Sequence, residues 1–159
     1  MRQSYLDAWE DYETSLVKKN FPKWDYVILT VSNEEQAKAY RAQIDYRLEN
    51  HFLPVQTTYI VLPDPGGKRV GSGGASFHVI RYIVEDSIKN TGKIPADGHF
   101  VGKRILVIHS GGDSKRIPQY SACGKLFSPV PRELPNGKPS TLFDEFIISM
   151  SGMPSRMKE

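Results

Sequence analysis

Apolar residues recur along the chain with helical or strand-like spacing, and each change of spacing marks a predicted element. A first amphipathic helix is predicted over residues 4–19, where apolar side chains recur every three or four positions: Leu6, Trp9, Tyr12 and Leu16. The β-branched and aromatic run WDYVILT, residues 24–30, predicts a strand. A capping Ser32-Asn33 pair and two acids then introduce a second helix with its own apolar stripe, Ala37, Tyr40, Ile44 and Leu48.

The same order of elements returns twice. The run TTYIVLP, residues 57–63, predicts a second strand, which is followed by the turn-rich segment DPGGKRVGSGGA, residues 64–75. A helix should come next, with a stripe formed by Phe77, Ile80, Val84 and Ile88. The run KRILVIH, residues 103–109, predicts a third strand.

The C-terminal part combines a proline-rich segment with one more helix. The segment PVPRELPNGKPS, residues 129–140, indicates an exposed connector or a hairpin. The helix is predicted within residues 139–154, with Ser140 or Thr141 as its N-cap and Gly152 and Pro154 as its stop.

Alternating strands and helices predict an α/β fold with three layers and a mostly parallel sheet, because right-handed crossovers place helices on both of its faces. A length of 159 residues is typical of one domain. Hydrophobic residues make up 39% of the chain and charged residues 25%, which excludes wholesale disorder. In such sheets ligands bind at the carboxyl ends of the strands.

Charge and cysteine content narrow the function classes. The formal charge of +3 is too small to indicate a nucleic-acid partner, although it is compatible with small anions. The single cysteine, Cys123, excludes an internal disulfide and a thiolate metal cluster. We find neither an apolar stretch long enough to cross a bilayer nor a signal peptide, and therefore expect a cytoplasmic protein without a membrane partner.

The first glycine-rich segment is a candidate anion site. Gly71, Ser72, Gly73 and Gly74 stand between a predicted strand and a helix, where backbone N–H groups and the helix dipole can hold a phosphate. Lys68 and Arg69, just upstream, add charge. The spacing is neither the dinucleotide fingerprint, which would need glycine at position 76, nor a P-loop. The alternative is that these glycines only serve tight turns.

The second glycine-rich segment follows the third strand. Its residues Gly111, Gly112, Asp113, Ser114, Lys115 and Arg116 offer backbone donors, a hydroxyl group and fixed positive charge, and Lys125 follows before an apolar stretch. A lysine that ends such a loop can return to the anion that the glycine backbone holds. We therefore predict two anion-binding segments at one cleft.

Three stretches together resemble a known family. They are LPDPGGKRVGSGGA, RILVIHSGGDSKRIPQYSACGKLFSPVPRELP and STLFDEFIISMSG. Their order is similar to the guanylyltransferase portion of bifunctional fucokinase/GDP-fucose pyrophosphorylase proteins, and the resemblance extends from Trp24 onward. It implies a Rossmann-like sugar nucleotidyltransferase fold and a reaction in which GTP and fucose 1-phosphate give GDP-fucose and pyrophosphate, with a divalent cation, usually Mg²⁺.

The resemblance also implies roles for individual residues. Gly111 and Gly112 would bind the nucleotide phosphates through their backbone. Arg116 would hold the departing β- and γ-phosphates, and Lys125 would contact the α-phosphate or the sugar phosphate. Arg116 and Lys125 are thus the predicted catalytic residues.

Several assignments stay open. The family pattern commonly has glycine and threonine before the arginine, whereas this chain has Asp113-Ser114-Lys115; Asp113 is either a turn residue or oriented toward magnesium. Asp64 has the same two interpretations. His109 either touches the ligand or is a buried, hydrogen-bonded histidine. The segment at 71–74 would hold the base, the ribose or a phosphate, and the metal ligands are unknown.

Family members are several times longer, with a sugar-binding region and a kinase domain, so we expect this chain to be an incomplete piece that partners with those C-terminal domains. Residues 1–23 would form a helical segment and residues 24–159 the N-terminal, nucleotide-binding part of the domain. A second hypothesis is a non-catalytic nucleotide-binding or interaction fragment. A redox Rossmann domain is disfavoured because the dinucleotide fingerprint is absent.

Overall fold

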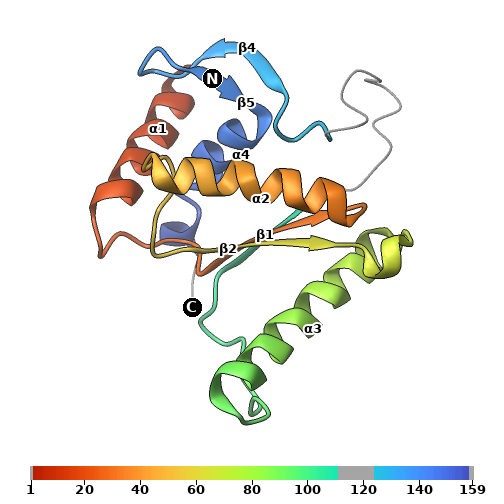
Figure 1. Cartoon of the computed structure of the whole chain (residues 1–159). Helices are drawn as coiled ribbons and strands as arrows, with labels where there is room; N and C mark the ends of the chain where they lie inside the picture. The colour runs from red at the N-terminus through yellow and green to blue at the C-terminus, as the bar shows by residue number, and fades with distance from the viewer. Residues whose placement is uncertain (1, 111–123, 158–159) are drawn as a thin grey trace.

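The computed structural model describes residues 2–110 and 124–157, and its centre is a three-stranded parallel sheet. The strands, in the order β2-β1-β3, are β1 (Tyr26–Val31), β2 (Thr58–Pro63) and β3 (Ile105–His109). Between them the chain forms α2 (Glu34–Glu49) and α3 (Gly71–Thr91), which lie on opposite sides of the sheet (Figure 1). The predicted alternation of strands and helices and the parallel sheet are therefore confirmed.

The register of the sheet brings all three carboxyl ends to one edge. Thr30 of β1 pairs with Leu62 of β2 on one side and with His109 of β3 on the other. Because parallel strands joined by crossovers end at the same edge, the segments after β1, β2 and β3 meet there.

β1 is the centre of the core because it is buried on both faces. Val27, Leu29 and Val31 point toward the layer formed by α2, α1 and α4. Ile28 points to the other side, where it packs with Val79 and Ile83 of α3. A central parallel strand must bury both faces, which is why it appears in the sequence as a continuous apolar run rather than an alternating one.

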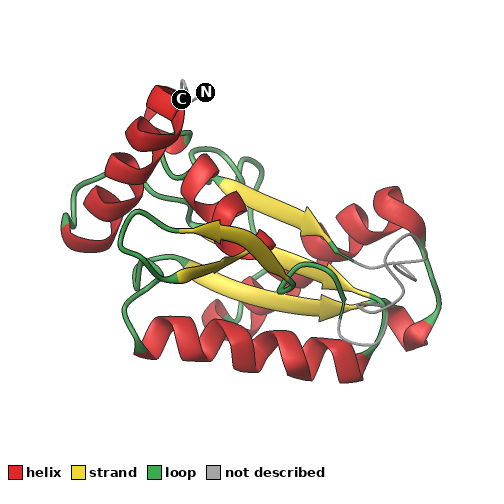
Figure 2. Ribbon diagram, turned by 90° about the horizontal axis from the view of Figure 1, so that it is seen from above, coloured by secondary structure: helices red, strands yellow, loops and turns green. Residues whose placement is uncertain are grey.

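The remaining elements surround this sheet. They are α1 (Arg2–Val17), the antiparallel hairpin of β4 (Pro129–Glu133) and β5 (Pro139–Thr141), α4 (Leu142–Met150), and two 3₁₀ turns, η1 (Pro65–Gly67) and η3 (Pro154–Arg156). α1 packs against α4. Figure 2 shows the same arrangement from above, with helices in red and strands in yellow. The proline-rich segment is thus a hairpin, and the N-cap of α4 is Thr141.

Two predictions about α3 were wrong in detail. The helix begins at Gly71, so the segment at 71–75 forms its first turn instead of a loop before it. Its buried face consists of Ala75, Val79 and Ile83, whereas Phe77, from the predicted stripe, has 75% of its surface exposed. Val79 and Ile83 each stand one position before Ile80 and Val84 of the predicted stripe, so the buried face is turned by about one residue from the prediction.

Within the described ranges, none of the helices combines the length and the apolar character that crossing a bilayer requires.

Candidate functional site

Hydrogen bonds to the end of β1 hold the two segments that follow β2 and β3 at the carboxyl edge of the sheet. The backbone N–H of Asp64 donates to the carbonyl oxygen of Val31 at 2.8 Å. The N–H and the hydroxyl group of Ser110 both donate to the carbonyl oxygen of Thr30, at 3.0 and 2.9 Å. The chain therefore leaves β2 and β3 from fixed points on either side of β1.

A cavity of about 260 Å³ opens at this edge. Its lining comes from the ends of all three strands and from the start of α3: Thr30, Asp64, Arg69, Gly71, Ser72, Ala75 and His109. One carboxylate, one guanidinium group and one imidazole thus border the same space. The parallel sheet predicts a ligand site at this position.

The first turn of α3 lies at this cavity. The N-cap residue of α3 is Val70, whose side chain makes no capping hydrogen bond. The N–H groups of the first turn have no partner within an α-helix, and together with the helix dipole they favour an anion. Gly71 and Ser72 of this turn line the cavity.

At two positions of this turn, 71 and 74, the backbone conformation or the packing explains why the residue is glycine. Gly71 has φ +69°, in the left-handed region that favours glycine. A Cβ atom on Gly74 would lie 2.7 Å from the Cβ atom of Val70, so the turn needs glycine there for packing. A Cβ atom on Gly73 would meet no atom within 4 Å. Steric crowding therefore explains Gly74 but not Gly73.

The far end of the second segment returns to the same edge. Gly124 is buried, has φ +73°, and lies directly against the side chains of Tyr40 and Gln36 at the start of α2. Lys125 follows it, is exposed, and lines a second cavity of about 440 Å³ together with His109 and Ser110. His109 borders both cavities.

Of the predicted site residues, the structure thus brings Gly71, Ser72 and Lys125 to one edge of the sheet. The predicted residues Gly111, Gly112, Asp113, Ser114, Lys115 and Arg116, together with Cys123, lie outside the described residues. Their assignments stay predictions.

The sequence alone did not single out Thr30 and Ser76. Thr30 Oγ1 lies 3.0 Å from His109 Nδ1, and Ser76 Oγ lies 3.3 Å from His109 Nε2. The signal for Thr30 was present, because it stands at the carboxyl end of a buried strand. Ser76 lies on α3, and no pattern in the neighbouring sequence predicts its contact with His109.

No group of three or more His, Cys, Asp or Glu side chains with the spacing of a metal site occurs among residues 2–110 and 124–157. Asp64 supplies the carboxylate at the cavity of the carboxyl edge. A nucleotide-bound Mg²⁺ takes one or two carboxylates in addition to phosphate oxygens, so a single aspartate is compatible with such a metal.

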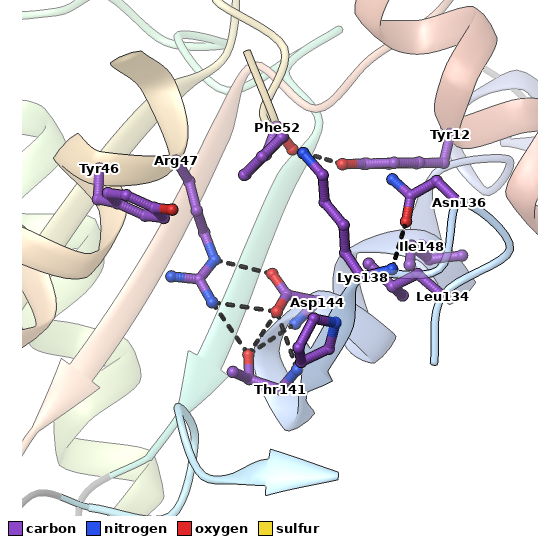
Figure 3. A pocket seen from close by; sticks show the side chains of 11 residues that line it. Tyr12, Tyr46, Arg47, Phe52, Leu134, Asn136, Lys138, Thr141, Asp144 and Ile148 are labelled. Atoms are coloured by element: carbon purple, nitrogen blue, oxygen red, sulfur yellow. Dashed lines mark hydrogen bonds and ion pairs between the residues drawn. The ribbon is translucent and has the colours of Figure 1, made fainter. Parts of the chain in front are cut away.

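Another cavity, of about 330 Å³, lies away from this edge, between α1, the end of α2, the β4–β5 hairpin and α4 (Figure 3). Its polar centre is Arg47, whose Nε and Nη2 donate to the two carboxylate oxygens of Asp144 at 2.7 and 3.0 Å. Arg47 also donates to Thr141 and twice to Gln43. With all five donors engaged, Arg47 acts as a structural clamp between α2 and α4.

The charge of Arg47 changes the titration of its partner. Burial on its own would raise the pKa of Asp144, but hydrogen bonds from Arg47 and Thr141 and the positive charge of Arg47 outweigh burial and hold the pKa below its ordinary value. Burial, helped by the negative charge of Asp144, raises the pKa of the nearby Tyr12, whose hydroxyl group donates to the carbonyl oxygen of Phe52 at 2.7 Å. The cavity is therefore held by an ionised pair and a neutral tyrosine at neutral pH.

Comparisons with known proteins agree on one family. Residues 99–159 match the family model described as the fucose pyrophosphorylase domain. Fucose-1-phosphate guanylyltransferase from Mus musculus is 33% identical over 139 residues, which cover 85% of this chain. Bifunctional fucokinase/GDP-fucose pyrophosphorylase from Arabidopsis thaliana is 33% identical over 145 residues, or 82% of this chain. Fucose-1-phosphate guanylyltransferase from Homo sapiens is 35% identical over 108 residues, or 68% of this chain.

These relatives are much longer than the chain. It spans 21% of the mouse protein, 14% of the Arabidopsis protein and 16% of the human protein. No solved structure matches the chain.

Proposed function

Because this chain belongs to the fucose pyrophosphorylase family, we propose that it forms the nucleotide-binding part of a fucose-1-phosphate guanylyltransferase. The whole enzyme would transfer GMP from GTP to fucose 1-phosphate and release pyrophosphate. The corresponding fold would be a Rossmann-like sugar nucleotidyltransferase fold, completed by the remainder of the longer protein.

One observation carries this proposal. The uncapped first turn of α3, Arg69 and His109 border one cavity at the carboxyl edge of the parallel sheet, and Lys125 borders the adjoining cavity with His109. Backbone N–H groups at a helix start, combined with the positive charges of Arg69 and Lys125, suit a polyphosphate. The predicted second glycine segment connects Ser110 to Gly124, both of which lie at this edge.

The proposed chemistry asks the protein mainly for positioning and charge stabilisation. An oxygen of the sugar phosphate attacks the α-phosphorus of GTP in line, a new P–O bond forms, and the bond from the α-phosphorus to the bridging oxygen breaks as pyrophosphate leaves. Negative charge grows on the leaving group during this step, so fixed cations and backbone donors lower the barrier. Arg69 and the α3 amides would bind one part of the triphosphate, and Lys125 would bind the α-phosphate or the sugar phosphate.

A divalent cation, which we expect to be Mg²⁺, would neutralise part of the phosphate charge when it is bound. Asp64 lines this cavity, and its carboxylate would be one ligand of the ion.

Thermal unfolding of the chain with GTP and Mg²⁺ tests the proposal. Because a ligand that binds only the folded state stabilises it, GTP at ten times its dissociation constant should add about 1.4 kcal/mol and raise the melting temperature. Lys125→Gln should reduce this increase. Lys89→Gln is the matched control, because Lys89 is also exposed but stands about 27 Å farther along α3 than Gly71.

A steric variant probes the α3 side of the site. Ser72→Leu places a larger side chain at the cavity, and leucine is a better helix former than serine, so GTP affinity should fall without loss of stability. Ser4→Leu is its control, since Ser4 is an exposed serine in the first turn of α1. If millimolar GTP leaves the melting temperature of the unchanged chain where it was, the chain does not bind nucleotide by itself, and the alternative of an interaction fragment is favoured.

A further inference from the structure

His109 occupies a distinctive position at the carboxyl edge. It is the last residue of β3, its side chain is exposed, and it borders both the cavity at the start of α3 and the cavity that holds Lys125. Its Nδ1 atom lies 3.0 Å from Oγ1 of Thr30, on β1. Its Nε2 atom lies 3.3 Å from Oγ of Ser76, on α3. Both ring nitrogens therefore have hydroxyl partners, each from a different element.

The hydroxyl protons determine which ring nitrogen carries hydrogen. Ser76 Oγ donates its one proton to the carbonyl oxygen of Ser72 at 3.0 Å, as serines in helices commonly do. Toward His109 the Ser76 oxygen can then only accept, so Nε2 carries the hydrogen. In the neutral ring Nδ1 is the acceptor, and it receives the hydroxyl proton of Thr30. The imidazole is thus held with its N–H directed toward the start of α3.

The two contacts differ in how easily they can be exchanged. Thr30 is 4% exposed and belongs to the central strand, so it fixes one side of the ring. Ser76 offers a neutral oxygen at the longer distance of 3.3 Å. An anionic oxygen is a better acceptor than a hydroxyl group, because charge-assisted hydrogen bonds are roughly twice as strong as neutral ones.

We propose that His109 is a phosphate-binding residue of the nucleotide site: its Nε2–H donates to a phosphate oxygen of GTP in place of Ser76, while Thr30 keeps the ring oriented. This inference rests on the proposed function and adds to it a residue that the glycine segments and basic side chains did not include. A ring that is oriented before the ligand arrives loses little freedom on binding, which is the advantage of a preorganised donor. Its place between the two cavities allows it to contact a phosphate shared by both.

Asparagine and glutamine separate the two nitrogens experimentally. The amide of His109→Asn reaches only as far as Nδ1 and can contact Thr30, whereas the amide of His109→Gln extends toward the position of Nε2. We expect His109→Ala and His109→Asn to weaken the binding of GTP about tenfold to a hundredfold, which corresponds to the loss of a hydrogen bond to a charged group. His109→Gln should retain most of the affinity.

Calorimetric titration of the chain with GTP, and with inorganic triphosphate as a probe without base and sugar, measures these affinities. The loss should be the same for both ligands if His109 contacts phosphate. Ser76→Ala removes the competing acceptor and should leave GTP binding equal or slightly tighter. Melting temperatures without ligand show whether each variant is folded.

The outcomes distinguish this inference from the proposed function. If the unchanged chain binds GTP and His109→Gln, His109→Asn and His109→Ala bind it equally well, the role of His109 is overturned and the proposed function stands. Better recovery by asparagine than by glutamine would also overturn it, because that pattern would assign His109 only a structural contact with Thr30. If the unchanged chain binds neither GTP nor triphosphate, both proposals fail together.

Discussion

Arg47 and Asp144 form a two-pronged ion pair across 97 residues of sequence, with Nε–Oδ1 at 2.7 Å and Nη2–Oδ2 at 3.0 Å. The side chains are only 7% and 17% exposed, so the pair is largely removed from water. The guanidinium group also lies 4.9 Å from the ring centre of Phe127. The pair joins the end of α2 to the first turn of α4.

Replacing Arg47 by methionine should lower the free energy of unfolding by about 3–5 kcal/mol, because Asp144 would stay buried without its partner. Urea unfolding at neutral pH measures this change. Arg81→Met is the control: the Arg81–Glu85 pair is exposed, and its loss should leave stability almost unchanged. Equal effects of the two substitutions would show that the Arg47 pair contributes no more than a surface pair.

The stability of the chain should depend on pH through Asp144. Since the folded-state pKa lies below the ordinary value of 3.8, the folded state binds this proton less readily than the unfolded state. The resulting stabilisation is complete above the unfolded pKa and is lost as the pH falls through the lower, folded pKa. The free energy of unfolding should therefore decrease as the pH is lowered from about 5 toward 3.

Asp144→Asn isolates this contribution. The variant should be less stable than the unchanged chain at pH 7, and the difference should shrink as the pH falls, because protonation removes the charge that the substitution removes. Urea unfolding at a series of pH values follows the difference. A gap of the same size at every pH would assign the stabilisation to hydrogen bonding alone.

Gly124 should not tolerate alanine. A Cβ atom there would overlap the side chains of Tyr40 and Gln36, and φ is +73°. A left-handed backbone costs about 1–2 kcal/mol and overpacking about 1–3 kcal/mol, so Gly124→Ala should destabilise the fold by about 3 kcal/mol. Gly137→Ala is the matched control, since Gly137 has φ +77° but no atom within 4 Å of the added Cβ. That variant should lose about 1 kcal/mol, and equal losses in thermal or urea unfolding would exclude the packing contribution.

Local sequence determined the elements because their signals are local. The β-branched run at 24–30 and the recurrence of apolar residues from Ala37 to Leu48 correspond to β1 and α2. The parallel sheet followed from this alternation, since crossover helices must cover both faces. The same topology predicted the carboxyl edge of the sheet as the place of the candidate site, and a cavity does open there.

Sequence patterns were less reliable where two local structures, such as a loop and a first helical turn, have similar free energies. Glycines are poor helix formers, so the segment at 71–75 favoured a loop, yet a first turn has few internal hydrogen bonds to lose and accommodates it. The stripe from Phe77 to Ile88 is as helical as the face from Ala75 to Ile83. Contact with the sheet selects the second face, because Val79 and Ile83 pack there against Ile28 and Leu62 of the strands.

Chain sequence by itself therefore determined the order of strands and helices, the parallel sheet, the two glycine-rich segments and the family resemblance. Only the tertiary structure decided that Arg47 pairs with Asp144. It also decided that the ring of His109 contacts Thr30 of β1 and Ser76 of α3. The physical reason is that periodicity, capping and turn preferences act over a few neighbouring residues. Side chains separated by tens of residues meet only once the sheet register and the helix packing have placed them.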